Sequence, residues 1–153
     1  MTRVLFVCTG NTCRSPMAEA MLRRGLETAG KPDVAVASAG TGAWEGAPAS
    51  EGSYLVSLEH DLDLSAHRAR LLTRAVVDEA DLILTMSRTH LARVRELGGG
   101  ARAHLLGEYA GLSGAGADIT DPFGGDLEDY RATFRAIAAL MPAVLTRLSG
   151  TVT

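Results

Sequence analysis

The sequence predicts an α/β protein in which a parallel β-sheet lies between two layers of helices. Short apolar runs of strand character alternate with longer segments of helical periodicity along the whole chain. Strands separated by helices are typical of right-handed crossovers between parallel strands. The 153 residues can bury a substantial core without stabilising disulfides or metal ions, and they contain no internal repeat or linker. We therefore expect a single three-layer α/β sandwich domain over residues 1–153.

The first half of the chain is predicted to form two strands and two helices. The apolar run Arg3–Val7 predicts the first strand. The segment from Pro16 to about Thr28 predicts a helix, because its apolar residues fall near one face and a proline suits the first helical turn. Val34–Ala37 predicts the second strand, and Pro48–His60 is expected to be helical after the glycine-rich loop Ser38–Gly46.

The second half is predicted to add two strands and three helices. Its first strand is apolar at nearly every position, as is typical of burial on both faces. The short helix before that strand can be capped by a threonine, and the long last helix contains a proline that is expected to bend or interrupt it. In chain order, the elements are the helix Arg74–Glu79 capped by Thr73, the strand Asp81–Met86, the helix Arg88–Leu97, the strand Ala103–Leu106, and the helix Leu127–Leu148 with Pro142.

Composition and cysteine content exclude several classes of protein. The formal net charge of −3 gives no general attraction to nucleic acid or to an anionic membrane. No apolar run reaches the length of a transmembrane helix, and the first strand begins too early for a signal peptide, so we expect a cytoplasmic protein. The two cysteines, Cys8 and Cys13, lie in one loop, and no histidine or cysteine spacing indicates a metal site. Their clustering favours reactivity over a structural disulfide.

The most specific chemical signal is the loop between the first strand and the first helix. Cys8 ends the strand at a carboxyl edge, where ligands bind in α/β sheets, and the loop runs to Arg14. Gly10 and Asn11 can adopt left-handed backbone angles, so that successive N–H groups form a nest for an anion beside the positive end of the helix. That field favours the Cys8 thiolate, and Arg14 can clamp two oxygens of a phosphoryl group. The residues expected to surround the phosphate are Thr9, Gly10, Asn11, Thr12, Cys13, Arg14 and Ser15.

An aspartate late in the chain can supply the proton that a leaving group needs. Asp121 begins the sequence Asp-Pro-Phe-Gly-Gly, in which the proline stiffens the backbone behind the acid. A carboxyl group near a thiolate nucleophile can protonate the departing atom and then deprotonate the water that hydrolyses a phosphocysteine. Taken alone, this segment is typical of a plain turn. Together with Cys8 and Arg14, it predicts an enzyme that transfers phosphoryl groups.

The same residues resemble a known family. Val7–Glu19, with the sequence Val-Cys-Thr-Gly-Asn-Thr-Cys-Arg-Ser-Pro-Met-Ala-Glu, resembles the signature of the low-molecular-weight protein tyrosine phosphatases. Asp121–Pro122 has the position of that family's acid loop. Ser38–Gly42 and His67–Arg70 also resemble family segments, so the similarity covers most of the chain.

This resemblance implies a fold and a mechanism. The fold is a flavodoxin- or Rossmann-like sheet of four parallel strands flanked by helices, and the reaction has two steps and uses neither metal nor cofactor. The resemblance assigns Cys8 as the nucleophile that becomes the phosphocysteine, Arg14 as the phosphate clamp, and Asp121 as general acid and base. The expected partner is a phosphorylated protein or peptide, and we expect the protein to be a monomer.

Further roles carry over from the resemblance one position at a time. Ser15 matches a residue that donates a hydrogen bond to the thiolate of Cys8. Asn11, Ser38 and His67 match a polar network that holds the loop in its strained shape. For His67, a surface histidine after a turn is an equally good reading of the local sequence.

Thr12 is the position that bears on the substrate. Members specific for phosphotyrosine usually carry a larger aliphatic residue here, whereas a branch resembling the bacterial protein-arginine phosphatases has threonine together with Asp-Pro-Phe-Gly-Gly. A small polar wall leaves room for a planar guanidinium, with which Asp121 can pair while Phe123 covers one side. We therefore favour phosphoarginine over phosphotyrosine, although Thr12 can also reflect neutral drift. Trp44 is expected either to line the mouth of the pocket or to dock its loop onto the body of the protein.

The remaining alternatives depend on the cysteines. Cys13 matches a neighbour that can trap an oxidised Cys8 as a disulfide, or it is a small apolar residue at the start of the helix. Arsenate reduction needs further cysteines to resolve a thiol–arsenate adduct, and the chain has none beyond Cys13. A catalytically silent anion-binding module is disfavoured because binding alone needs neither a thiol nor an acid.

Overall fold

The computed structural model describes residues 1–150, except for the side chains of residues 115, 116 and 150. Residues 151–153, at the end of the expected domain, lie outside the described part. The strands are β1 (Thr2–Cys8), β2 (Val34–Gly40), β3 (Leu82–Thr85) and β4 (Ala103–Leu105). The α-helices are α1 (Arg14–Thr28), α2 (Glu51–Leu58), α3 (Arg74–Glu79), α4 (Arg88–Glu96), α5 (Leu106–Tyr109) and α6 (Leu127–Gly150), and two 3-10 helices span Gly100–Arg102 and Gly114–Ala117.

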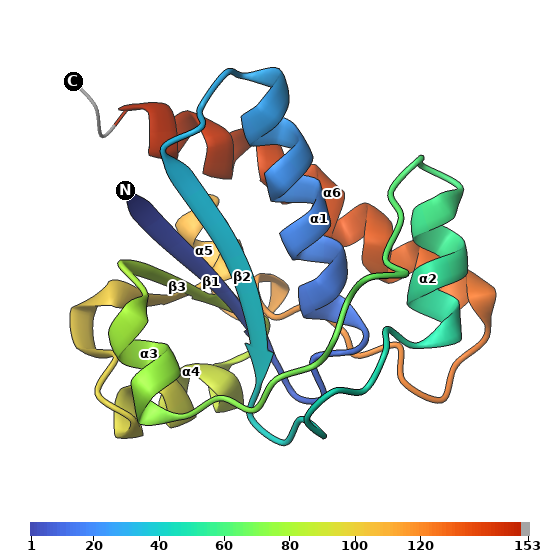
Figure 1. Cartoon of the computed structure of the whole chain (residues 1–153), viewed down its shortest axis with the longest axis horizontal. Coiled ribbons are helices and arrows are strands. Elements are labelled where there is room, and N and C mark those ends of the chain that lie inside the picture. The colour runs from blue at the N-terminus through green and yellow to red at the C-terminus, as the bar shows by residue number, and fades with distance from the viewer. Residues whose placement is uncertain (151–153) are drawn as a thin grey trace.

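The four strands form one parallel sheet in the order β2-β1-β3-β4. Helices α1 and α6 cover one face, and α3 and α4 cover the other (Figure 1). This arrangement confirms the expected α/β sandwich. It follows from the sequence because parallel neighbours need crossover connections, and here each crossover carries a helix.

Alternate side chains of β1 enter two separate apolar cores. Phe6 and Cys8 belong to the core under α1 and α6, whereas Leu5 and Val7 belong to the core under α3 and α4. All four side chains are at most 2% exposed. Burying a side chain of this size stabilises the fold by roughly 1.5–3 kcal/mol. The first core therefore fixes Cys8 at the end of a strand that is buried on both faces.

Several details of the elements differ from the expectations. Strand β2 continues to Gly40, so Ser38 lies in the strand and not in the glycine-rich loop, because its backbone pairs with that of Phe6 on β1. The second helix spans only Glu51–Leu58, where Ser50 accepts a hydrogen bond from the Ser53 N–H and caps it. Helix α5 was not expected.

Pro142 does not interrupt the last helix, which continues through it. The loss of one backbone hydrogen bond is outweighed by apolar packing before and after the proline, where Ile137 and Val144 are both fully buried. Within residues 1–150, no helix combines the length and the apolar character needed to cross a membrane.

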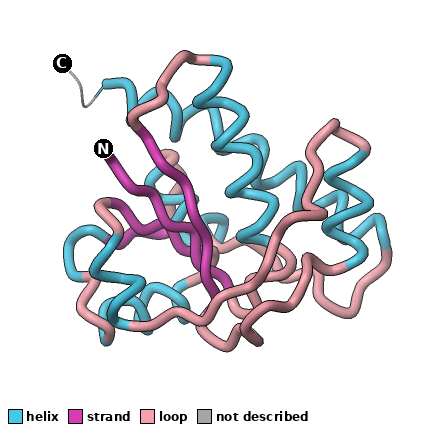
Figure 2. Tube along the Cα trace, viewed as in Figure 1, coloured by secondary structure: helices cyan, strands magenta, loops and turns pink. Residues whose placement is uncertain are grey.

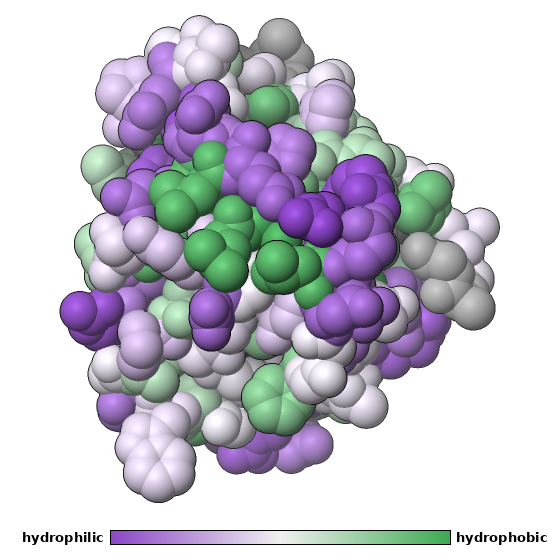
Figure 3. Space-filling model, turned by 90° about the vertical axis from the view of Figure 1, so that its right-hand side faces the viewer, coloured by the Kyte–Doolittle hydropathy of each residue, from purple (hydrophilic) through white to green (hydrophobic). Residues whose placement is uncertain are grey.

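Helix α2 packs closely on α6. A Cβ atom on Gly52 would lie 2.5 Å from the Tyr130 ring, so only glycine permits this approach. The preceding Ser50 N–H donates to the Thr12 carbonyl at 2.9 Å, which ties this helix to the loop after β1. Leu55 and Leu58 of α2 remain partly exposed. Figure 3 views the molecule from this side and shows hydrophobic residues surrounded by hydrophilic ones.

The carboxyl ends of the strands meet at one edge of the sheet, and the loops that follow β1 and β2 lie there together (Figure 2). Cys8 pairs with Gly40 across this edge, and Val7 pairs with Thr85. A Cβ atom on Gly40 would lie 2.4 Å from the Thr9 carbonyl oxygen and 2.8 Å from the Asn11 nitrogen. Glycine at this position therefore lets the loop after β1 fold back over the end of β2.

Candidate active site

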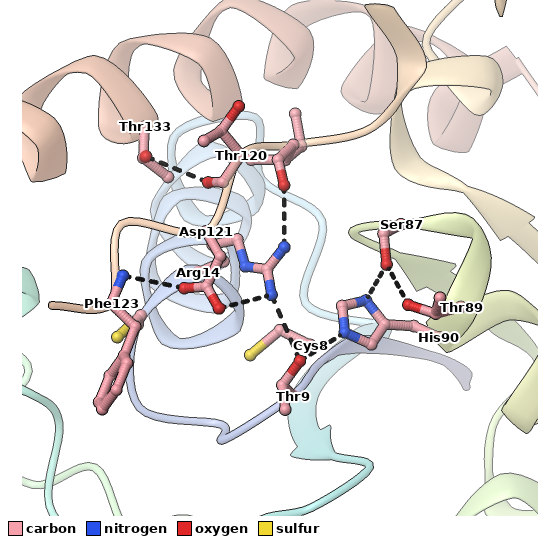
Figure 4. A network of polar contacts seen from close by, with 12 residues as sticks. Cys8, Thr9, Arg14, Ser87, Thr89, His90, Thr120, Asp121, Phe123 and Thr133 are labelled. Carbon is pink, nitrogen blue, oxygen red and sulfur yellow. Dashed lines mark hydrogen bonds and ion pairs between the residues drawn. The ribbon is translucent and has the colours of Figure 1, made fainter. Parts of the chain in front are cut away.

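The three residues predicted to be catalytic line one cavity at this edge. The cavity has a volume of about 230 Å³ and is lined by Cys8, Thr9, Gly10, Thr12, Cys13, Arg14, Asp121 and Phe123. Cys8 and Arg14 come from the two ends of the loop between β1 and α1, and Asp121 comes from the loop before α6, more than a hundred residues later (Figure 4). The fold therefore brings together side chains that are remote in the sequence.

The sulfur of Cys8 contacts a buried serine hydroxyl. The sulfur lies 3.0 Å from Ser15 Oγ, and both side chains are buried. Ser15 Oγ also accepts a hydrogen bond of 2.8 Å from Asn11 Nδ2, which can only donate. The serine hydrogen is therefore free to point at the sulfur, an arrangement that stabilises a thiolate. The predicted contact between Ser15 and Cys8 is present.

Arg14 is held in place by its own hydrogen bonds. Its side chain is 5% exposed, and Nη1 donates to the Ile119 carbonyl at 2.8 Å. Nη2 lies 3.5 Å from both Thr9 Oγ1 and Asp121 Oδ2. Nε is buried and has no hydrogen-bond partner among the described residues. A buried donor without a partner destabilises the fold. An anion in the cavity would accept hydrogen bonds from both Nε and Nη2, in a bidentate contact.

Asp121 is the most exposed of the three, with 46% of its side chain accessible. Its Oδ1 atom accepts a 3.0 Å hydrogen bond from the Phe123 N–H, and Oδ2 faces Arg14. The loop is tied to α6, because Thr133 Oγ1 donates to the Thr120 carbonyl at 3.3 Å. The carboxyl group is thus fixed at the rim of the cavity, where solvent can reach it.

The predicted network around Asn11 is assembled as expected. Asn11 has a left-handed φ of 56°, is fully buried, and donates from Nδ2 to Ser38 Oγ at 2.9 Å. Its carbonyl oxygen accepts from His67 Nε2 at 2.6 Å, and its Oδ1 accepts from the Arg70 N–H at 2.9 Å. His67 is therefore part of this network and not an unattached surface histidine. Glu19, which accepts from Ser38 Oγ, was not predicted.

Cys13 has a second polar environment. Its sulfur lies 3.4 Å from Ser50 Oγ and 3.6 Å from the Tyr130 hydroxyl. Burial, with the hydrogen bond to Cys13, raises the pKa of Tyr130, so this phenol remains a neutral partner. Both cysteines are free thiols. A redox role for Cys13 remains a prediction.

The residues predicted to set selectivity divide into two groups. Thr12 and Phe123 line the cavity, although Phe123 is 79% exposed. Trp44 does not line the cavity, and its side chain is 84% exposed, so it neither forms the mouth nor docks its loop. The loop is instead anchored by its backbone, since the Gly42 N–H donates to the Thr9 carbonyl at 2.9 Å.

His90 is a further residue beside the site that was not predicted. His90 Nε2 lies 2.8 Å from Thr9 Oγ1, and its Nδ1 lies 2.9 Å from Ser87 Oγ (Figure 4). Burial first, and then the charge of Arg14, lowers the pKa of His90 to about 4. The signal that could have found it is its position just after β3, whose carboxyl end lies at the same edge as that of β1.

In the described part of the chain, no three histidine, cysteine, aspartate or glutamate side chains are grouped so that they could hold a metal ion. What the geometry offers is a buried sulfur, a fixed guanidinium and an accessible carboxyl group around one small cavity. This combination can bind an oxyanion, attack its central atom and transfer a proton.

Comparisons with known proteins agree with this chemistry. Residues 3–152 match the family described as Low molecular weight phosphotyrosine protein phosphatase. The chain is 39% identical over 146 residues to a protein-arginine-phosphatase of Geobacillus stearothermophilus, and the match covers 95% of each protein. It is also 39% identical over 145 residues to low molecular weight protein-tyrosine phosphatase A of Mycobacterium tuberculosis, covering 92% of this chain and 88% of that protein.

A solved structure adds a chemical detail. The chain superposes on a cysteine-to-serine mutant of the YwlE arginine phosphatase with a TM-score of 0.88 and 32% identity, covering 97% of this chain and 96% of that one. That mutant is described as carrying a phosphorylated active-site serine.

Proposed function

The chain belongs to the low-molecular-weight phosphotyrosine protein phosphatases, and on this basis we propose that it dephosphorylates protein side chains through Cys8, with phosphoarginine as the favoured substrate. The protein is a hydrolase of the protein phosphatase class. The observation that carries the assignment of roles is the single cavity in which Cys8, Arg14 and Asp121 meet.

The proposed first step transfers the phosphoryl group to sulfur. The Cys8 thiolate attacks the phosphorus atom, a sulfur–phosphorus bond forms, and the bond to the side-chain nitrogen or oxygen of the substrate breaks. Asp121 donates its proton to that departing atom, which leaves neutral. Arg14 and the loop N–H groups hold the three equatorial oxygens, on which negative charge is spread in the transition state. The buried Nε of Arg14 gains its missing partner in this step.

The proposed second step returns the enzyme to its starting state. Asp121, now a carboxylate, removes a proton from water, and the resulting hydroxide attacks the phosphocysteine. The sulfur–phosphorus bond breaks, inorganic phosphate leaves, and Cys8 is again a thiolate stabilised by Ser15. The phosphorylated serine in the related mutant structure supports a covalent intermediate at this position.

Two observations favour phosphoarginine over phosphotyrosine. Thr12 supplies a small, polar part of the cavity wall, where a longer aliphatic side chain would pack on a phenol ring. Asp121 lies 3.5 Å from the guanidinium group of Arg14, which supports the proposal that its carboxylate can pair with the guanidinium of a substrate. Phosphotyrosine is the second candidate, because relatives with either name are equally similar in sequence to this chain.

We further propose a single phosphatase domain that works in the cytoplasm as a monomer without metal or cofactor. A thiolate nucleophile is kept active by a reducing compartment, and both cysteines are free. Light scattering on the purified protein measures the oligomeric state directly.

The test of substrate preference uses two peptides of identical sequence, one with phosphoarginine and one with phosphotyrosine. We expect a higher kcat/KM for the phosphoarginine peptide, and we expect Thr12→Ile to shift the ratio toward phosphotyrosine by roughly tenfold or more, as a change of a few methyl groups in a pocket allows. An unchanged ratio in Thr12→Ile would remove Thr12 from its assigned role. Cys8→Ser is the control, and it should abolish turnover of both peptides while it still binds phosphate.

A further inference from the structure

His90 is a buried polar side chain that contacts the loop between β1 and α1 from outside that loop. It lies in the first turn of α4, is 3% exposed, and reaches Thr9 Oγ1 at 2.8 Å with Nε2. Its other ring nitrogen is held by Ser87 Oγ at 2.9 Å, and that hydroxyl is in turn 2.8 Å from Thr89 Oγ1. Both ring nitrogens therefore have partners, and the ring is fixed in orientation (Figure 4).

The contact between His90 and Thr9 continues to the phosphate clamp. Arg14 Nη2 lies 3.5 Å from Thr9 Oγ1, and an arginine can only donate, so the Thr9 oxygen is the acceptor there. His90 holds the same oxygen from the other side, and it therefore determines where the lone pairs of that oxygen point. The chain of contacts from Ser87 through His90 and Thr9 thus ends on the guanidinium nitrogen that faces the cavity.

The electrostatic surroundings keep His90 uncharged at neutral pH. Burial first, and the positive charge of Arg14 second, lower the pKa of His90, whereas Asp121 and Asp118 act in the other direction. A neutral imidazole can hold the Thr9 hydroxyl without placing a second cation beside Arg14. Arg14 therefore supplies the positive charge that binds an anion at this side of the cavity.

We propose that His90 is a positioning residue. It holds the Thr9 hydroxyl, and this hydroxyl in turn helps to hold the Arg14 guanidinium in the geometry that binds phosphate. This inference rests on the proposed phosphatase function. His90 contacts no atom that reacts, and its effect reaches the substrate only through Thr9 and Arg14.

A set of substitutions at His90 tests the proposal, with inorganic phosphate as the probe. The end of a glutamine side chain lies near the place of Nε2 and can still contact Thr9, whereas an asparagine ends near Nδ1 and reaches only Ser87. We expect His90→Asn and His90→Phe to raise the inhibition constant of phosphate roughly tenfold, as loss of one hydrogen bond in an ionic network does. His90→Gln should restore most of the affinity. Loss of folded protein alone would lower the maximal rate and leave the inhibition constant unchanged.

A double-mutant cycle and a matched control complete the test. Because His90 acts through the Thr9 hydroxyl, Thr9→Val combined with His90→Phe should weaken phosphate binding no more than Thr9→Val alone. His104→Gln, on β4 and outside the cavity, should leave the phosphate constant unchanged.

Three results would overturn the inference: an unchanged phosphate constant in His90→Phe, a His90→Gln variant no better than His90→Asn, or additive losses in the cycle. If the unmodified enzyme fails to hydrolyse p-nitrophenyl phosphate, the proposed function itself fails. If it hydrolyses this substrate and the His90 variants bind phosphate normally, only the role of His90 fails.

Discussion

Replacing His90 by glutamine should remove a large part of the pH dependence of stability. In the unfolded chain a histidine titrates near 6.5, whereas burial and the charge of Arg14 lower the pKa of His90 to about 4 in the folded protein. Between these values the unfolded chain binds a proton that the folded protein does not, so the free energy of unfolding falls as the pH falls from about 6.5 to 4. At about 1.4 kcal/mol per pH unit, the full loss is about 3 kcal/mol. Above pH 7 the stability from this group is fully present, and its loss is complete only about one pH unit below the folded pKa.

The assay is urea denaturation of the wild type and His90→Gln at intervals from pH 4 to pH 8. The quantity of interest is the difference between their free energies of unfolding, in which the titration of other groups cancels. His104 is one such group, since burial first and Arg147 second also lower its pKa. We expect the advantage of the wild type to be about 3 kcal/mol larger at pH 7.5 than at pH 4. A difference that stays constant with pH would contradict this prediction, because it would show that His90 titrates alike in both states.

Three further predictions concern other parts of the site. Asp121→Asn should lower kcat on peptide substrates by about 10²–10⁴-fold and lower it much less on p-nitrophenyl phosphate, whose leaving group needs no proton; equal losses would argue against an acid role. Gly40→Ala should lower kcat/KM sharply, because the new Cβ would lie 2.4 Å from the Thr9 carbonyl oxygen, whereas Gly42→Ala, with no atom nearer than 4.0 Å, should behave like the wild type. Asn11→Ala should cost about 2–4 kcal/mol in urea denaturation through its lost hydrogen bonds. Asn11→Gly, which accepts the left-handed φ of 56°, should recover only about 1 kcal/mol of that loss, and full recovery would show that strain and not hydrogen bonding dominates.

The sheet and most helices could be predicted because their signals are local. The apolar run of β1 and the helical spacing after Pro16 decide their own structure within a few residues. The true end of β2 could not be predicted, since the strand extends to Gly40 only because β1 offers backbone partners beside it. The same holds for Pro142, where packing against the core overrides a residue that locally disfavours a helix.

Within the site, the structure brings together the predicted residues that lie in one loop, and most of them line the same cavity. Cys8 and Arg14 form a weak signal as a pair, but the strand before them and the helix after them predict a nest for an anion. Trp44 illustrates the opposite case, since an isolated tryptophan in a glycine-rich loop carries no information about which way its side chain faces. It lies almost wholly exposed, away from the residues that line the cavity.

The alternating architecture and the class of chemistry could therefore be predicted from the sequence alone. These depend on neighbouring residues, and backbone geometry transmits them directly into structure. The sequence named Asp121 as the acid, but its contact with Arg14 and the place of His90 beside the loop follow only from the tertiary structure. Asp121 meets Arg14 at 3.5 Å, and His90 meets Thr9 at 2.8 Å, because parallel strands place their carboxyl ends at one edge of the sheet. Contacts across that edge depend on the order in which the strands pair, and that order is an outcome of packing the whole chain.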